Sequence, residues 1–220
     1  MLIKSNIFSD RVVHAFTTAD YDLSPRAKDW ERFAEFFGGQ YSYALVSQVH
    51  GDLVLTAEKP GLQGEADALS TSIPGLVLAI RTADCVPILV ESDTEVFAIH
   101  AGWRGIANGI ITKTLLHVQG LRAAAIGPCI SLEAYEVGRE VVDGIVASGV
   151  PKDIFVQEKE PRPHVDLKAA AAFQLRQCRV PNIDVLPHCT FLDHQFHSYR
   201  RDGNASGRLA GLIAFRKEAN

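Results

Sequence analysis

Two apolar runs between residues 75 and 100 constrain this chain more than any other part of its sequence. They read G-L-V-L-A-I-R and V-P-I-L-V-E-S-D-T-E-V-F-A-I-H, and such β-rich runs are typical of strands buried in a core. Asp84 and Cys85 stand between the runs, Arg81 ends the first, and the turn A-G-W-R-G follows His100. The buried strands therefore end at a group of reactive side chains, which predicts a pocket at that point.

Strand and helix patterns alternate irregularly along the rest of the chain. Ser24 and Pro25 start a predicted helix that ends near residue 38, and runs 41–50 and 53–57 predict a hairpin that turns at Gly51-Asp52. A helix is expected over 106–118. The later expected elements are a strand at 123–129, helices at 141–149 and 167–178, the second capped by Asp166, and a last strand at 209–215.

This order favours a mixed-sheet α/β fold, and a chain of 220 residues is long enough for one well-buried core. We therefore interpret residues 1–220 as a single domain. The sequence contains no G-x-G-x-x-G, P-loop, H-E-x-x-H or G-x-S-x-G motif, which disfavours the commonest nucleotide-binding, metalloprotease and serine-hydrolase interpretations.

Composition limits the partners of the chain. Its formal net charge of −4 gives no broad attraction to nucleic acid or to an anionic membrane, so neither is expected as a partner. The N-terminus has no basic start followed by a long apolar segment, which predicts a cytoplasmic protein. Four scattered cysteines are expected to be reduced thiols rather than a disulfide framework.

The hairpin between the two apolar runs predicts that Cys85 and His100 meet. With a turn centred on Ser92-Asp93 and no bulge, the two residues are directly opposite, with Cβ atoms roughly 4.5 to 5.5 Å apart. Pro87 weakens the prediction because a proline often marks a strand edge or bulge. With His50 at a third strand end, the pair could be zinc ligands with one open position, or a thiol and its base. The alternative is that Cys85 is a small buried hydrophobe.

Charged residues near this hairpin are open to two interpretations. Asp84, Arg81 and Arg104 either pair with one another or serve a polar ligand. Arg104, at a helix start, could hold phosphate or be solvated. The run F-H-S-Y-R-R-D-G-N-A-S-G-R could bind substrate, although its D-G-N segment favours a surface turn.

Motifs in order along nearly the whole chain resemble one family. They are S-Q-V-H-G, A-D-A-L-S-T, T-A-D-C-V-P-I-L, H-A-G-W-R-G, I-G-P-C-I, Y-E-V-G and S-Y-R-R-D-G. By these the chain is identified as a member of the YfiH family, also called the laccase-domain or polyphenol oxidase family. The resemblance implies layered α/β/β/α architecture with mixed sheets, similar to the catalytic domain of cytotoxic necrotising factors. It also implies that His50, Cys85 and His100 bind a metal, usually zinc.

The resemblance implies several activities, and the residues help to rank them. Members are assigned purine nucleoside phosphorylase and adenosine deaminase activities, copper-dependent phenol oxidation, and editing of peptidoglycan precursors. Copper suits N/S ligands, but this chain has one methionine and no H-x-H pair, which does not favour several coppers acting together. We therefore expect a zinc enzyme acting on purine nucleosides, by phosphorolysis of adenosine or inosine and by deamination of adenosine. The alternatives are a copper-dependent polyphenol oxidase and a precursor-editing hydrolase or amidase with Cys85 as nucleophile.

Roles for the remaining site residues follow from this interpretation. Asp84 and Arg104 are expected to be catalytic, and Gln48, Arg200 and Arg201 to bind substrate. The family commonly has an arginine where this chain has Ala19. If that arginine binds phosphate or ribose, Arg104, Arg200 and Arg201 are the candidates to replace it. Sequence gives no prediction of the oligomeric state.

Overall fold

Two six-stranded sheets form the centre of the fold, which a computed structural model describes for residues 1–24, 37 and 41–217. Sheet 1 has the order β1 (Leu2–Ile3), β2 (Val12–Thr17), β14 (Leu209–Phe215), β7 (Leu76–Thr82), β3 (Ser42–Ser47) and β5 (Gly61–Glu65). Sheet 2 has the order β13 (Asn182–Val185), β10 (Leu121–Ile126), β8 (Val86–Ser92), β9 (Val96–Ala101), β6 (Ala68–Thr71) and β4 (Val54–Thr56). Both sheets mix parallel and antiparallel pairs, as the sequence predicts.

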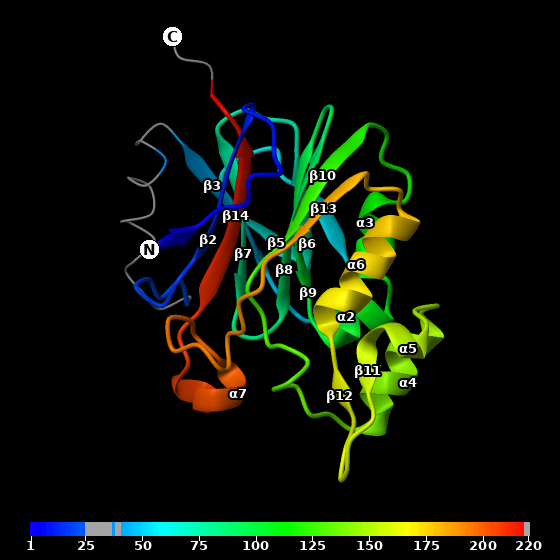
Figure 1. Cartoon of the computed structure of the whole chain (residues 1–220). Helices are drawn as coiled ribbons and strands as arrows, with labels where there is room; N and C mark the ends of the chain where they lie inside the picture. The colour runs from blue at the N-terminus through cyan, green and yellow to red at the C-terminus, as the bar shows by residue number, and fades with distance from the viewer. Residues whose placement is uncertain (25–36, 38–40, 218–220) are drawn as a thin grey trace.

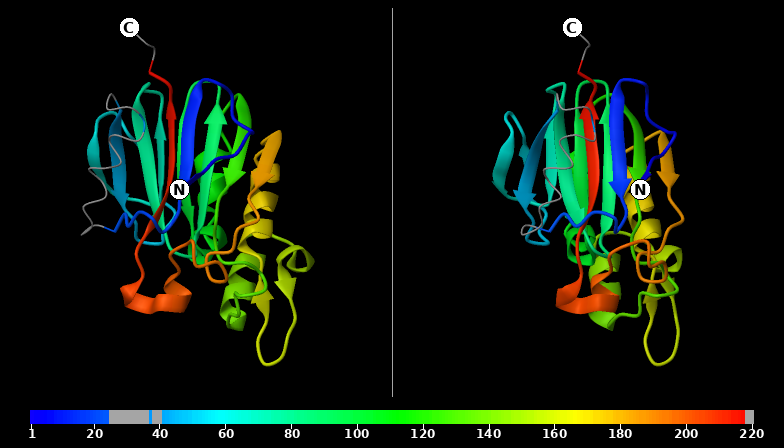
Figure 2. Two further views of the ribbon diagram at one scale, coloured as in Figure 1. Left: turned by 60° about the vertical axis from the view of Figure 1, so that its left-hand side comes forward. Right: turned by 90° about the vertical axis from the view of Figure 1, so that its left-hand side faces the viewer.

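Helices cover the outer face of sheet 2 (Figure 1, Figure 2). The covering helices are α2 (Trp103–Ala107), α3 (Ile110–Leu115) and α6 (Leu167–Gln177). Helix α4 (Arg139–Ala147) packs against α2, and α5 (Lys152–Phe155) packs against α6, beside a small ribbon of β11 (Val156–Gln157) and β12 (His164–Val165). The short helix α7 (Tyr199–Asp202), followed by a 3-10 turn at Gly203–Ala205, lies below the strand ends, opposite the C-terminus. The helix expected at 25–38 falls almost wholly outside the described residues.

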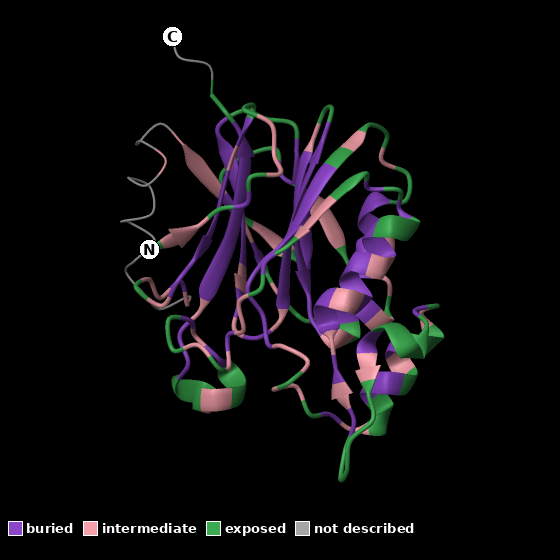
Figure 3. Ribbon diagram, in the orientation of Figure 1, coloured by how far each residue is buried: buried purple, intermediate pink, exposed green. Residues whose placement is uncertain are grey.

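The central strands of both sheets are largely buried (Figure 3), and period-two alternation divides their side chains between two layers. In β7, Leu78 and Ile80 pack between the two sheets, whereas Val77 and Ala79 face the outside of sheet 1. In sheet 2, Ile88, Val90, Phe97 and Ile99 face the helices, whereas Leu89 and Ala98 face sheet 1. The buried strands thus form an inter-sheet layer and a layer under the helices, and the layer between the sheets leads to the candidate site.

Several predicted elements are confirmed. Strand β10 and helix α4 overlap the expected segments and begin two residues earlier, and strand β14 has the expected bounds. Asp166 caps α6, because its side chain accepts a hydrogen bond from the Ala169 amide at 2.9 Å. Among the described residues, no helix combines the length and the apolar character needed to cross a bilayer. The likeness to the necrotising-factor domain stays a prediction.

Two local predictions are wrong. The expected hairpin at Gly51-Asp52 does not form: β3 pairs in parallel with β7 in sheet 1, whereas β4 pairs in parallel with β6 in sheet 2. The loop's amide groups bind the Asp67 carboxylate instead of continuing a ladder. The helix expected at 106–118 is broken after Asn108, because Gly109 has a left-handed φ of 77° and starts α3.

Buried His14 in β2 makes stability depend on pH. Its Nε2 accepts a hydrogen bond from the Ser5 amide at 3.0 Å. Burial and then the charge of Lys4 lower the pKa of His14 from 6.5 to about 4. Between these two pH values the unfolded chain therefore binds more protons than the folded chain. The stability that depends on neutral His14 is fully present above pH 6.5 and is lost as pH falls towards 4.

We expect the His14→Gln variant, which keeps an acceptor for Ser5, to lose this pH dependence. Urea unfolding between pH 7 and 4.5 measures it. The wild-type free energy of unfolding should fall more steeply than that of the variant, by up to about 1.4 kcal/mol per pH unit. Parallel curves for the two proteins would contradict this.

Candidate active site

A cavity of about 670 Å³ opens at the end of the two sheets where α2 and α7 lie. Its volume is within the range of small-molecule sites. Strand ends, loops and both short helices contribute to its wall. The lining residues are Gln48, His50, Arg81, Thr82, Ala83, Asp84, Cys85, His100, Trp103, Arg104, Tyr135, Tyr199, Arg200 and Arg208.

His100 is the next-to-last residue of β9. It lies on the same face as Ala98 and therefore at the end of the inter-sheet layer. It is 3% exposed. Its Nδ1 lies 2.7 Å from Oδ1 of Asp67, which is fully buried. This contact leaves Nε2 of His100 for the cavity, because the carboxylate fixes the ring orientation.

Cys85 immediately precedes β8 and lies on the same side of the hairpin as His100. The predicted register is wrong by two residues, because the turn is at Asp93-Thr94 and His100 pairs with Pro87. The Ser92 hydroxyl accepts from the Glu95 amide at 2.9 Å and closes this later turn. A shift of two keeps every side chain on its face, so Cys85 and His100 become diagonal neighbours.

His50 reaches the cavity from the loop between β3 and β4. Its backbone has a φ of 59°, a conformation that is uncommon outside glycine. The Asp67 carboxylate holds this turn by accepting from the amides of His50 at 3.0 Å and Gly51 at 2.7 Å. One buried carboxylate thus positions two of the three expected ligands.

The three expected ligands come together. The donor atoms of His50, Cys85 and His100 all lie within 4.8 Å of one another, and the two imidazole rings are edge-to-face with centroids 4.9 Å apart. A Cβ added at Gly102 would lie 3.1 Å from the Cys85 sulfur, so a side chain at this position would crowd the sulfur. Two nitrogens and a sulfur with an open side fit a catalytic zinc ion, and their chemistry also suits copper.

Charges in this cluster favour a thiolate beside a cationic or metal-bound imidazole. Burial raises the pKa of Cys85, but the charge of His100 and hydrogen bonding from His100 and His50 outweigh it and lower the pKa to about 6. For His100 burial acts in the opposite direction and lowers the pKa, but Cys85 and Asp67 outweigh it and raise the pKa to about 9. The deprotonated sulfur is the form that binds metal or attacks a substrate.

Asp84 lies at the cavity wall with both carboxylate oxygens engaged. Oδ1 accepts from the Thr190 hydroxyl at 2.6 Å, and Oδ2 accepts from the Arg200 amide at 2.6 Å. The residue has a φ of 86°, a second strained position beside the site. These bonds connect the predicted catalytic carboxylate to α7.

The predicted arginines separate into two groups. Arg104 and Arg200 line the cavity, where their guanidinium groups lie over Trp103 and Tyr135 at 4.5 and 5.0 Å from the ring centroids. Arg201 is not among the lining residues, because its guanidinium donates to main-chain carbonyls, including Phe196 at 2.7 Å.

Gln48 lines the cavity with its amide already bonded. Nε2 donates to the Arg81 carbonyl at 2.7 Å and Oε1 accepts from the Arg81 amide at 2.8 Å. Ala19, at the position where the family commonly has arginine, is outside the lining set. The binding roles of Gln48, Arg200 and Arg201 stay predictions.

Sequence reasoning assigned no role to several residues that the fold brings to the site. They are Asp67, Trp103, Tyr135, Tyr199 and Arg208. Asp67 lies in the motif A-D-A-L-S-T and Tyr135 in Y-E-V-G, so the motif matches were an available signal. Arg208 closes the polar run that sequence favoured as a surface turn.

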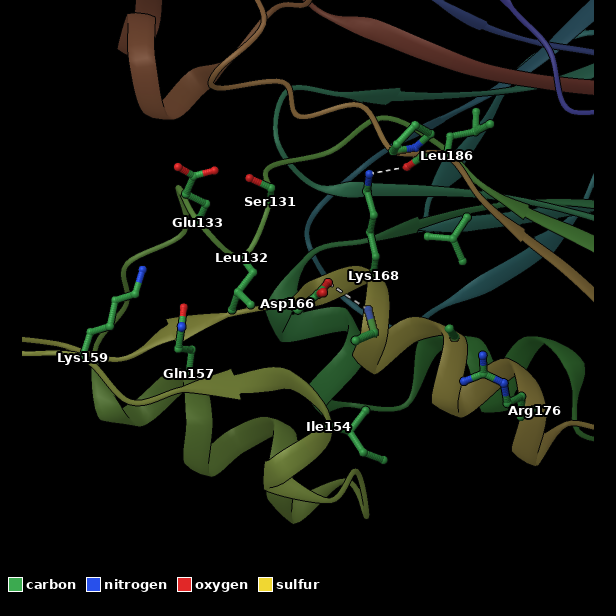
Figure 4. Close-up of a pocket in the computed structure, with 14 residues that line it drawn as sticks. Ser131, Leu132, Glu133, Ile154, Gln157, Lys159, Asp166, Lys168, Arg176 and Leu186 are labelled. Carbon is green, nitrogen blue, oxygen red and sulfur yellow. Dashed lines mark hydrogen bonds between the residues drawn. The ribbon is translucent and has the colours of Figure 1, made fainter.

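A second cavity, of about 580 Å³, lies beside α6 (Figure 4) and shares no lining residue with the first. Its most buried charge is Lys168, which donates to the carbonyls of Leu186 and His188. Asp166 is occupied in capping α6. These bonds hold α6 against the segment after β13, so the charges of this cavity have a structural role.

The fold and the cluster define an α/β protein with a three-ligand candidate metal site at one end of two packed sheets. The family model described as multicopper polyphenol oxidoreductase laccase matches residues 16–216. The chain therefore belongs to this family, which includes the YfiH proteins, as its motifs indicate.

Three relatives illustrate the similarity. A purine nucleoside phosphorylase of Deinococcus radiodurans is 38% identical over 202 residues, covering 87% of this chain and 78% of the relative. A Neisseria meningitidis protein, NMB0706, has a TM-score of 0.86 with 27% identity, covering 99% of both chains. The Bacillus licheniformis protein YfiH has a TM-score of 0.83 with 25% identity, covering 93% of both chains.

Replacing Asp67 should weaken metal binding without removing a ligand. We expect Asp67→Asn to lower zinc affinity by about 10- to 100-fold, because the neutral amide orients His100 and the 49–51 turn less strongly. Competition with a chromophoric chelator measures the affinity. Asp52→Asn is the control, since partly exposed Asp52 lies on the same loop as His50 and pairs with Lys113 of α3. Equal affinities for all three proteins would refute the role of Asp67.

Proposed function

We propose that this protein is a zinc-dependent enzyme that cleaves purine nucleosides with phosphate. The observation that carries the proposal is one cavity that joins a His/Cys/His cluster to four arginines and three aromatic rings. The names of its relatives support the same reaction class.

Since β14 from the end of the chain pairs with β2 from its beginning, we also propose that residues 1–220 form one domain.

The aromatic side chains suit a purine ring. Trp103, Tyr135 and Tyr199 line the cavity, and aromatic faces bind flat heterocycles by stacking. Thr82 lies at the same wall, 2% exposed, and its hydroxyl has no hydrogen-bond partner in the described part of the chain. Because buried polar groups are normally paired, a ligand hydroxyl would satisfy it.

The charged side chains suit phosphorolysis. In that reaction a phosphate oxygen forms a bond to the sugar C1′, the bond from C1′ to the base breaks, and the base takes a proton. Arginines would bind the phosphate, and Asp84, the carboxylate of the lining set, would carry the proton. A bound zinc ion would supply polarisation of an oxygen, from phosphate or from water. Adenosine deamination is a different step, in which water would add to C6 of the base and ammonia would leave while the bond from C1′ stays intact, and the same cavity would accommodate it.

A second candidate is a cysteine hydrolase or amidase. Cys85, His100 and Asp67 have the order nucleophile, base and orienting carboxylate, and the pKa of Cys85 is lowered to about 6 against the effect of burial. This arrangement would cleave an amide of a cell-wall precursor through an acyl-enzyme. A copper-dependent oxidase is a third candidate, named by the family description. The described residues offer one cluster of metal ligands, and oxidases with several coppers need more.

Metal content and phosphate dependence test the first proposal. We expect protein purified without added metal to contain about one zinc ion per chain. It should release free base from adenosine or inosine only when phosphate is present. Elemental analysis and chromatography of the products measure both. A fully zinc-loaded protein without turnover would contradict the proposal. Formation of inosine from adenosine without release of free base would show deamination alone.

Alkylation distinguishes a ligand from a nucleophile at Cys85. We expect iodoacetamide at neutral pH to leave Cys85 unlabelled until a chelator is added, because a zinc-bound thiolate is protected. Half-buried Cys189 is the internal control and should be labelled equally in both samples. Mass spectrometry of peptides reads both sites. Rapid labelling of Cys85 in the metal-loaded protein, with loss of activity, would favour the hydrolase.

A further inference from the structure

Arg81 and Arg208 are neighbours at the sheet 1 wall of the cavity. Arg81 pairs with Ala210 across the antiparallel β7–β14 ladder, and Arg208 directly precedes β14. Because side chains alternate along each strand, Arg208 lies on the same face as Ala210 and diagonally beside Arg81. Both residues line the cavity that contains the His/Cys/His cluster.

Neither of these two arginines forms an ion pair with a carboxylate of the described residues. The guanidinium of Arg81 donates to the Val46 carbonyl at 3.3 Å, and that of Arg208 to the carbonyls of Ser206 and Gly207 at 2.8 and 2.9 Å. Burial and then the charge of Arg208 lower the pKa of Arg81. The Asp22 carboxylate accepts from the main-chain amide of Arg208 at 2.9 Å, not from its guanidinium. The two guanidinium groups thus have neutral hydrogen-bond partners and repel each other, and an anion between them would remove that cost.

The position of Arg81 is also fixed relative to the metal cluster. Gln48, two residues before His50, bonds both main-chain groups of Arg81. Thr82, which carries the unpaired buried hydroxyl, is the next residue along β7 and pairs with Leu209. Alternation along β7 places the Thr82 side chain on the face opposite that of Arg81, so the hydroxyl belongs to a different part of the cavity wall. Arg208 lies 5.9 Å from the centroid of the Tyr199 ring, farther than Arg104 and Arg200 lie from their rings.

We infer that Arg81 and Arg208 form a phosphate subsite on the sheet 1 wall of the cavity. Two guanidinium groups can bind several oxygens of a tetrahedral dianion at once, which a single cation cannot do. The subsite rests on the proposed function, because it gives the place where the attacking phosphate binds. The same chemistry would accept a phosphate ester on a nucleoside, so the ligand is a phosphate group, inorganic or esterified.

Calorimetry with the metal-loaded protein tests the subsite. The probes are inorganic phosphate, adenosine and adenosine 5′-monophosphate, and the variants are Arg81→Gln and Arg208→Gln. Hydrogen bonds to charged groups are among the stronger ones, so we expect phosphate affinity to fall at least about 10-fold in each variant. Arg122→Gln is the matched control, because exposed Arg122 pairs with Asp93 at the hairpin turn, and it should bind phosphate as the wild type does.

The probes distinguish the two sources of phosphate. Loss of inorganic phosphate binding in both variants, with adenosine binding unchanged, supports a free phosphate. A phosphate ester is supported if both variants still bind inorganic phosphate as the wild type does but no longer bind adenosine 5′-monophosphate more tightly than adenosine. Unchanged affinity for both phosphates overturns the inference.

A wild-type measurement covers the case in which a variant does not fold. Phenylglyoxal should modify Arg81 and Arg208 more slowly when phosphate is present, while modification of Arg122 stays constant. Turnover of inosine separates this inference from the proposed function. Phosphate binding that depends on Arg81 in an inactive wild type would retain the subsite and refute phosphorolysis. Turnover whose KM for phosphate is the same in Arg81→Gln would refute the subsite.

Discussion

The buried carboxylate of Asp67 is the interaction on which the candidate site depends. It is fully excluded from solvent, contacts the imidazole of His100 and accepts from three consecutive amides at residues 49–51. Burial would raise the pKa of Asp67, but the hydrogen bonds from His100 and from the Gly51 amide, together with the charge of His100, lower it. A buried charge is tolerated only when it is paired and hydrogen-bonded in this way. His100 belongs to sheet 2 and the three amides to the loop that joins the two sheets, so the same bonds that keep Asp67 ionised align the ligands.

Alternation along the strands explains how much of the site sequence could predict. The face of Cys85 and His100 follows from period-two alternation, and an error of two residues in the turn leaves that face unchanged. An error of one residue would have moved His100 out of the inter-sheet layer. The apolar runs also predicted the buried strands of both sheets, because strands covered on two faces have nearly continuous hydrophobic sequence.

The remaining features depend on contacts that are distant in sequence. The 51–52 turn has the residues of a hairpin, but Asp67 takes its amides, and β3 and β4 enter different sheets. Arg208 joins Arg81 only because the last strand inserts between β2 and β7. The break at Asn108-Gly109 was marked by residues that favour turns, yet the helical spacing of the flanking apolar residues outweighed it.

The end of the paired sheets gives this cavity two walls with different chemistry. Cys85 and His100 come from sheet 2, whereas Arg81 and Arg208 come from sheet 1. Gln48 and His50 lie on one loop, so that loop fixes the distance between the cationic wall and the metal cluster. A substrate that must be polarised at one end and meet an anion at the other needs such a fixed separation, because catalysis depends on the alignment of both reactants. Rigid strands supply that alignment, and the short helices α2 and α7 add the aromatic and cationic side chains that select what lies between the walls.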